Sequence, residues 1–156
     1  MNSVTTFDST KESLLDLLRS IKEGKTQLPD FQRGWVWDDE HIKSLLASIS
    51  LSYPIGAVMM LQTGNDEVQF KPRLVEGVIH QNQPEPERLI LDGQQRLTSL
   101  FQSLFSKQPV VTRDSRGKEI KRWYYLDINK ALDPTIDREE AIVSLPKDKK
   151  IRNFRG

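Results

Sequence analysis

The chain has 156 residues, which supports one core of ordinary size but not two comfortable domains, so we expect a single domain over residues 1–156. The formal net charge of +1 leaves any nucleic-acid contact to a local patch, and the lack of cysteine excludes disulfides, thiolate metal sites and cysteine nucleophiles. No apolar run approaches the roughly 20 residues of a membrane helix, and the N-terminus lacks a signal-peptide pattern, so we expect a cytoplasmic protein without membrane contact.

The first predicted element is an amphipathic helix near the N-terminus. Ser9 and Glu12 have the spacing of a capping box, and Gly24 is placed to end the helix. Apolar residues recur at helical spacing between them, at Leu14, Leu17, Leu18 and Ile21. Nothing on this helix is chemically unusual, so we interpret it as a packing element.

An extended segment with an uncommon set of side chains follows at 27–37. Gln32 and Arg33 offer an amide and a guanidinium fork that suit phosphate oxygens or a base edge, although an ion pair and a turn hydrogen bond would also explain them. Trp35 and Trp37 alternate, so both indole rings would point to one side of a strand. For Trp37 we favour a packing role, just before the predicted helix cap Asp38.

Three acids at 38–40 begin the next predicted helix. The helix dipole favours carboxylates at such a start, and neighbours one apart do not face one another, so we prefer a helix start over a metal site. The apolar stripe of this helix is Ile42, Leu45, Leu46 and Ile49.

The apolar run at 53–61 shows no polar alternation, which predicts a strand in the centre of the sheet. Pro54 and Gly56 stand at its start. They allow the first residues of the strand to come close to a ligand or to another part of the backbone.

The most informative stretch is RLILDGQQRLTSLF at 88–101. A buried strand breaks at Asp92 and Gly93, and a helix with an apolar face restarts at once. The unpaired N–H groups and the dipole of a helix start attract anions, and Gly93 lets a ligand approach the backbone there. The Arg96 guanidinium can bind phosphoryl oxygens. The Asp92 carboxylate can hold a metal or polarise a water. The simpler alternative is that Asp92 caps the helix and that the polar side chains after Gly93 are solvated.

A β-hairpin is predicted from two strand patterns, 110–112 and 120–126, on either side of the turn 114–117. It combines aromatic rings with cations, which suits stacking and pairing with nucleic acid. A sheet edge with solvated cations would look the same. The residues that we assign to a DNA contact are Trp35, Arg113, Lys121 and Arg122.

The last predicted elements are a strand at 141–145 and a basic tail at 146–156. The tail carries Lys147, Lys149, Lys150, Arg152 and Arg155. Such a tail binds phosphate without sequence preference, or is a solvated terminus or a linker.

Three stretches carry a resemblance to a known family: LPDFQRGWVWDDEHIKSLLASI, YPIGAVMML and LILDGQQRLTSL. In this order they resemble the DGQQR family, which forms the N-terminal part of GmrSD-type modification-dependent restriction enzymes and of SspE-like phage-defence proteins. The resemblance covers residues 25 to 106, and the DGQQR pentapeptide is complete. It implies an α+β fold similar to ParB and sulfiredoxin, with a mixed sheet flanked by helices.

The resemblance also implies a nucleotide-binding, NTP-hydrolysing domain that regulates DNA restriction, with Mg²⁺ accompanying the NTP. The expected nucleotide and phosphate contacts are Gln32, Arg33, Ile55, Gly56, Gly93, Gln94, Gln95, Arg96 and Thr98. The expected catalytic residues are Asp92, Gln95 and Arg96, with Asp92 also as the metal ligand. The alternative is a nonhydrolytic DNA-binding module that senses modified DNA through its phosphates.

Family members are usually longer and carry an HNH-type nuclease. His41 and His80 are the only histidines of this chain, and no His-Asn-His constellation can be assembled from them. We therefore expect an isolated regulatory domain, truncated or naturally split from its nuclease partner, that does not cleave DNA by itself.

Overall fold

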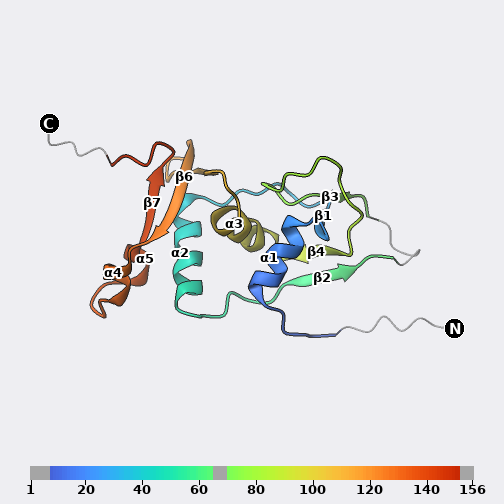
Figure 1. Ribbon diagram of the computed structural model, residues 1–156, viewed down its shortest axis with the longest axis horizontal. Coiled ribbons are helices and arrows are strands. Elements are labelled where there is room, and N and C mark those ends of the chain that lie inside the picture. Colours follow the sequence, from blue (N-terminus) through green and yellow to red (C-terminus); the bar gives the residue numbers. More distant parts are fainter. Residues whose placement is uncertain (1–7, 65–69, 152–156) are drawn as a thin grey trace.

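The computed structural model describes residues 8–64 and 70–151 and confirms the predicted α+β class. Within these residues the strands form two sheets, ordered β2-β4-β1-β3 and β5-β6-β7, with helices beside them (Figure 1). The elements are α1 (Leu14–Lys22), β1 (Thr26–Pro29), α2 (Asp39–Ser50), β2 (Met59–Gln62), β3 (Pro72–Arg73), β4 (Arg88–Asp92), α3 (Gln94–Leu104), β5 (Val110–Arg113), β6 (Glu119–Leu126), α4 (Ile128–Leu132), α5 (Arg138–Ala141) and β7 (Ile142–Pro146).

The first sheet is mixed, because β1 runs parallel to β4 whereas β2 and β3 are antiparallel to their neighbours. This mixed sheet with flanking helices is compatible with a ParB-like fold. None of the helices in the described part of the chain is long and apolar enough to cross a membrane.

The apolar run at 53–61 does not form the central strand that we predicted. Only Met59–Gln62 is a strand, and it lies at an edge of the first sheet, where Met59 is 49% exposed. Gly56 adopts a left-handed backbone with φ +95°, and the carbonyls on either side of it bond to a side chain from α3. These features keep the first half of the run out of the strand ladder.

The start of α1 also differs from the prediction. The helix begins at Leu14, and the residue before it, Ser13, makes no side-chain capping bond. Glu12 does not complete a capping box with Ser9, because its carboxylate pairs with the Arg88 guanidinium on β4 at 2.7 and 2.9 Å. The predicted end is confirmed, since α1 stops before Gly24, whose φ is +73°.

The predicted hairpin is confirmed as β5 and β6. Their pairing runs from Val110 opposite Arg122 to Arg113 opposite Glu119. In the turn, the Asp114 carboxylate accepts bonds from the backbone N–H groups of two later residues, at 2.9 Å each. The strand predicted at 141–145 is confirmed as β7, which pairs antiparallel with the last part of β6.

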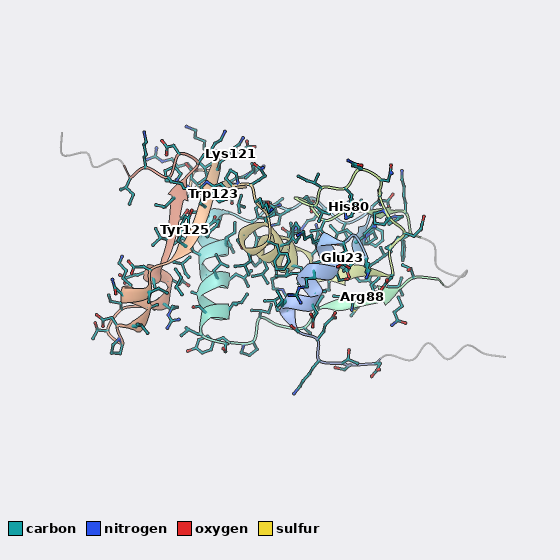
Figure 2. All side chains as sticks on the ribbon, in the orientation of Figure 1. Glu23, His80, Arg88, Lys121, Trp123 and Tyr125 are labelled. Carbon is teal, nitrogen blue, oxygen red and sulfur yellow. The ribbon has the colours of Figure 1, made fainter. Side chains whose placement is uncertain are left out.

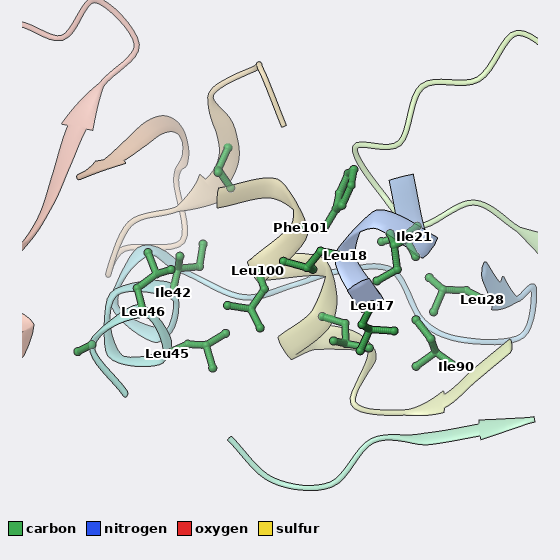
Figure 3. Close-up of a cluster of buried hydrophobic side chains, with 14 of the residues drawn as sticks. Leu17, Leu18, Ile21, Leu28, Ile42, Leu45, Leu46, Ile90, Leu100 and Phe101 are labelled. Atoms are coloured by element: carbon green, nitrogen blue, oxygen red, sulfur yellow. The ribbon is translucent and has the colours of Figure 1, made fainter. Parts of the chain in front are cut away.

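The hydrophobic core lies between α1, α3, α2 and the first sheet (Figure 3). Val110 from β5 and Ile142 from β7 belong to the same cluster, so apolar packing is continuous from the first sheet to the second. The most deeply buried members include Leu18, Ile21, Leu28, Ile42, Ile90, Leu97 and Leu100.

Polar contacts at the start of α2 connect the two halves of the fold. Asp38 is the N-cap, as predicted, and its carboxylate accepts a bond from the His41 N–H at 2.9 Å. The next carboxylate, Asp39, accepts bonds from the Tyr124 hydroxyl at 2.6 Å and from the Ser144 hydroxyl at 2.7 Å. One α2 side chain therefore bonds to both β6 and β7.

Candidate functional site

The turn from β4 to α3 has the backbone predicted from the sequence, a strand followed by a glycine and a helix start. Gly93 is left-handed, with φ +91°, and it precedes the first helical residue, Gln94. A Cβ on Gly93 would stand 3.0 Å from a Val58 methyl group, so a side chain there would be both strained and crowded. The first intrahelical bond is donated by Leu97 to the Gly93 carbonyl, which leaves the earlier N–H groups of α3 without an intrahelical acceptor.

A pocket of about 350 Å³ lies at this turn. Its walls contain most of the side chains that the sequence assigned to nucleotide binding, together with one of the two tryptophans of the extended segment. The lining residues are Gln32, Arg33, Trp37, Leu91, Asp92, Gly93, Gln94, Gln95 and Arg96. Segments about 60 positions apart in the sequence therefore meet at one site.

The two glutamines of the DGQQR motif hold the extended segment in place, a role that the sequence did not reveal. The Gln94 amide, 5% exposed, donates to the carbonyl of Arg33. Gln95 bonds in both directions: its Oε1 accepts from the Val36 N–H at 3.0 Å, and its Nε2 donates to the Gly34 carbonyl at 3.2 Å. The start of α3 thus fixes the backbone that presents Arg33 to the pocket.

Arg96 makes a similar contact with the segment before β2. Its guanidinium donates to the Ile55 carbonyl and, at 2.9 Å, to the Ala57 carbonyl. The intervening Gly56 packs directly against that guanidinium. Ile55 and Gly56 are therefore neighbours of a pocket residue and do not line the pocket themselves.

The motif keeps bonding capacity for a ligand despite these contacts. A glutamine amide has two donors and two acceptor sites, so Gln95 retains one of each. A guanidinium has five N–H donors, of which Arg96 uses two. Arg33 and Asp92 are exposed at the pocket, and the described residues provide no ion-pair partner for either side chain. Two guanidiniums and one carboxylate give the pocket a positive balance.

A second set of contacts to the extended segment comes from the end of β4 and from Arg73 and Glu76. Gln32 donates to the Leu91 carbonyl at 2.8 Å, and the Arg73 guanidinium donates to the Gln32 carbonyl at 3.1 Å. Arg73 also pairs with Glu76 at 3.0 Å, and that carboxylate accepts from the Trp35 N–H at 3.2 Å. Sequence reasoning missed Arg73 and Glu76, because neither belongs to a motif or a periodic pattern.

Some predicted residues lie outside the pocket. Thr98 is fully buried, its hydroxyl has no partner within the described residues, and it does not line the pocket. The Trp35 indole donates to the Ser99 hydroxyl of α3 at 2.8 Å. The other predicted DNA contacts, Arg113, Lys121 and Arg122, lie on β5 and β6.

The described residues contain no cluster of three histidines or acids that would hold a metal ion unaided. Of the described residues that line the pocket, Asp92 is the one carboxylate. This arrangement fits Mg²⁺ that arrives with a nucleotide, because magnesium in such sites takes one or two carboxylates and completes its shell with phosphate oxygens and water.

Comparison with known proteins places this geometry in a family. The chain is 32% identical over 141 residues to the uncharacterized protein MJ0686 of Methanocaldococcus jannaschii, an alignment that covers 88% of this chain and 23% of that protein. The chain thus spans about a quarter of the length of this relative. The family model described as "GmrSD restriction endonuclease, N-terminal domain" matches residues 14–155, which includes the pocket and both sheets. The chain therefore belongs to the family of GmrSD restriction endonuclease N-terminal domains.

Proposed function

We propose that the pocket at the start of α3 binds the phosphates of a magnesium-bound nucleoside triphosphate, and that this domain regulates DNA restriction by binding and hydrolysing that nucleotide. The observation that carries the proposal is the meeting of two guanidiniums, Arg33 and Arg96, with a left-handed glycine at a helix start, in a pocket of about 350 Å³. Membership of a restriction endonuclease family supports the regulatory part.

The electrostatics of the pocket favour a polyanion. Arg33 is exposed, and Arg96 has three N–H donors left after its bonds to the backbone. The dipole of α3 adds about half a positive charge at the same place. Asp92 would repel phosphate if it acted alone, but it fits as a ligand of the magnesium that the nucleotide brings with it.

Hydrolysis needs a positioned water and charge stabilisation more than it needs covalent chemistry. In the proposed reaction a water oxygen bonds to the γ-phosphorus while the bond to the bridging oxygen breaks, giving a nucleoside diphosphate and inorganic phosphate, with one water proton kept on the phosphate and the other released to solvent. Gln95 has one N–H and one acceptor site left to orient that water. Arg33 and Arg96 would offset the charge that develops on the phosphoryl oxygens.

The alternative function, a nonhydrolytic module that senses modified DNA, receives less support. It requires Trp35 as a reader alongside the cations of the hairpin. The Trp35 indole instead bonds to Ser99, and its backbone bonds to Glu76, so this residue is part of the support for the pocket. Magnesium dependence separates the two functions, since a reader of phosphates would show a steep salt dependence instead.

The nuclease that such a domain would control is proposed to lie in another part of a longer protein or in a partner subunit. The chain aligns with only 23% of the relative MJ0686, which leaves ample sequence there for a further domain. An HNH-type nuclease is the partner that we propose, and modified DNA is its proposed substrate.

The test is a paired assay of thermal stability and phosphate release with each of the four common NTPs and Mg²⁺. Arg33→Ala is the main variant, because its guanidinium has no ion pair in the described structure and its removal should leave the fold intact. Arg19→Ala, which removes a guanidinium on α1 that makes only an exposed ion pair with Asp16 at 3.4 Å, is the control. We expect stabilisation by at least one nucleotide for the parent and the control, and a clear reduction for Arg33→Ala.

The two parts of the proposal fail separately. If no nucleotide shifts the thermal midpoint of the parent, the binding proposal is wrong for this domain. If a nucleotide stabilises the parent but no phosphate is released above the level of Asp92→Asn, the pocket binds the nucleotide without hydrolysing it.

A further inference from the structure

The second sheet has one face that packs on the rest of the protein and one face that does not. Tyr124 and Ser144 point toward α2, where both hydroxyls bond to Asp39. Successive side chains on a strand point to opposite faces of the sheet, so the residues next to Tyr124 along β6 point away from α2. On β6 these are Lys121, Trp123 and Tyr125, which follow one another along the strand in Figure 2.

This outer face is a continuous surface across the three strands. Trp123 lies opposite Leu145, Tyr125 opposite Val143, and Lys121 opposite Val111. Tyr125 is 42% exposed and Val111 is 41% exposed. Two aromatic rings with apolar neighbours therefore stand on a sheet face that water reaches.

The loop after β7 supplies a cation to these rings. Lys149 adopts a left-handed backbone with φ +57°, and its ammonium lies 4.8 Å from the Trp123 ring centre and 5.7 Å from that of Tyr125. The Trp123 indole in turn donates to the Lys147 carbonyl at 3.3 Å. These contacts hold a positive charge over the faces of the two rings.

Further cations surround the face although the whole chain carries a formal charge of only +1. Arg113 and Lys121 stand on it, whereas Arg122 lies two residues from Tyr124 and points to the same side of the sheet as that residue. Among the acids here, Glu119 lies opposite Arg113, and the Asp148 carboxylate accepts a bond from the Lys150 N–H. Arg113, Lys121 and Lys149 against Glu119 leave this face with a positive balance.

We propose that this outer face, defined by Arg113, Lys121, Trp123, Tyr125 and Lys149, binds single-stranded nucleic acid. Unpaired bases would stack on the two rings, which stand two residues and so about 7 Å apart on one strand, and the Lys149 ammonium would move from the ring faces to a phosphate. The surrounding cations would contact the phosphates. A duplex hides the faces of its bases inside the helix, so rings on a flat sheet favour a strand whose bases are free. The inference does not depend on nucleotide binding at the α3 pocket.

The test is fluorescence anisotropy with a labelled oligothymidylate of about 15 nucleotides, a length within the range of sites on similar surfaces. Trp123→Ala should weaken binding about tenfold or more, whereas Trp123→Phe, which keeps a ring, should stay within about threefold of the parent. Lys149→Ala and Lys121→Ala should each reduce the slope of log affinity against log salt, by about 0.7 for each phosphate that the variant no longer neutralises. Lys22→Ala, at the exposed end of α1, is the control and should change neither quantity.

A blunt-ended duplex tests whether free bases are required, and the pocket variant Arg33→Ala tests whether the outer face binds independently of the pocket. The duplex should bind at least about tenfold more weakly than the single strand, since stacking of each base contributes about 1–3 kcal/mol. Arg33→Ala should bind the oligothymidylate like the parent even if it loses all response to nucleotides. If Trp123→Ala lowers the thermal midpoint, Tyr125→Ala tests the same surface at a more exposed ring.

Three results would overturn the proposal. The first is no binding of the oligothymidylate at low salt. The second is equal binding of the single strand and the duplex. The third is unchanged affinity in a folded Trp123→Ala or Tyr125→Ala variant.

Discussion

The guanidinium of Arg96 lies against Gly56, in the space that a Cβ at position 56 would occupy. The two residues are 40 positions apart in the sequence, and the arginine donates hydrogen bonds to the carbonyls on either side of the glycine. The absence of a side chain at position 56 permits this close approach.

Gly56→Ala should destabilise the protein by about 2 kcal/mol or more, because alanine is strained at a φ of +95° and its methyl group would displace Arg96. Urea unfolding measures the change. Gly64→Ala is the control: its φ is +97°, but a Cβ there meets none of the described residues within 4 Å, so it reports the backbone strain. Equal losses of stability at the two positions would show that the contact with Arg96 has no energetic importance.

Gln94→Leu should loosen the segment that carries Arg33. The substitution keeps a side chain of similar size at a buried position but removes the amide donor to the Arg33 carbonyl, which would retain only the 3.4 Å bond from the Arg73 guanidinium. Limited trypsin digestion should then cut after Arg33 several-fold faster than in the parent. Cleavage after Arg116, in the hairpin turn, is the internal control and should keep its rate.

The contribution of Asp38 to stability should depend on pH. The His41 backbone N–H and ring hold the pKa of this carboxyl below its usual range. A lowered pKa in the folded state means that the cap stabilises fully above the unfolded value of about 3.9 and loses its effect as the pH falls through the lower folded value. Asp38→Ala should therefore cost about 1 kcal/mol at pH 7 and much less near pH 2.

Asp38→Asn separates the cap from the charge. Asparagine keeps a capping oxygen but does not titrate, so this variant should show none of the pH dependence that Asp38 causes. If the parent and Asp38→Ala differ by the same amount at both pH values, the cap does not stabilise through its ionised form.

Tyr124→Phe and Ser144→Ala should not be additive. Both hydroxyls donate to the same Asp39 oxygen, at 2.6 and 2.7 Å, so the first substitution should cost about 1–2 kcal/mol and the effect of the second should depend on it. A double-mutant cycle in urea measures the coupling energy, and a value near zero would contradict the shared acceptor. Burial and the Asp39 bond also raise the pKa of Tyr124, so its absorbance should not report a tyrosinate in the usual alkaline range.

Local patterns in the sequence were enough to predict several parts of this structure. The strand, glycine and helix at 88–104 and the hairpin around Asp114 depend on periodicity and turn chemistry within a few residues. The residues that line the pocket were also largely predicted, because the DGQQR and QR elements are compact motifs.

The parts that were missed depend on distant partners. Glu12 pairs with Arg88 on β4, and the carbonyls of Ile55 and Ala57 in the run at 53–61 bond to Arg96, contacts that are not visible within a short window. In the same way, Gln94 and Gln95 were predicted to contact a ligand, whereas in the structure their amides also bond to the extended segment. Long-range hydrogen bonds decided each of these cases.

The segment between the pocket and α2 has a mechanical consequence. Trp37 lines the pocket, and its carbonyl accepts a bond from the Thr112 hydroxyl of β5 at 2.7 Å. Two residues later, Asp39 is bonded to β6 and β7. Each strand of the second sheet is thus hydrogen-bonded to the stretch 37–39, and Trp37 of this stretch lines the pocket. A displacement of this stretch must be shared by the second sheet, or at least one of these three hydrogen bonds must break.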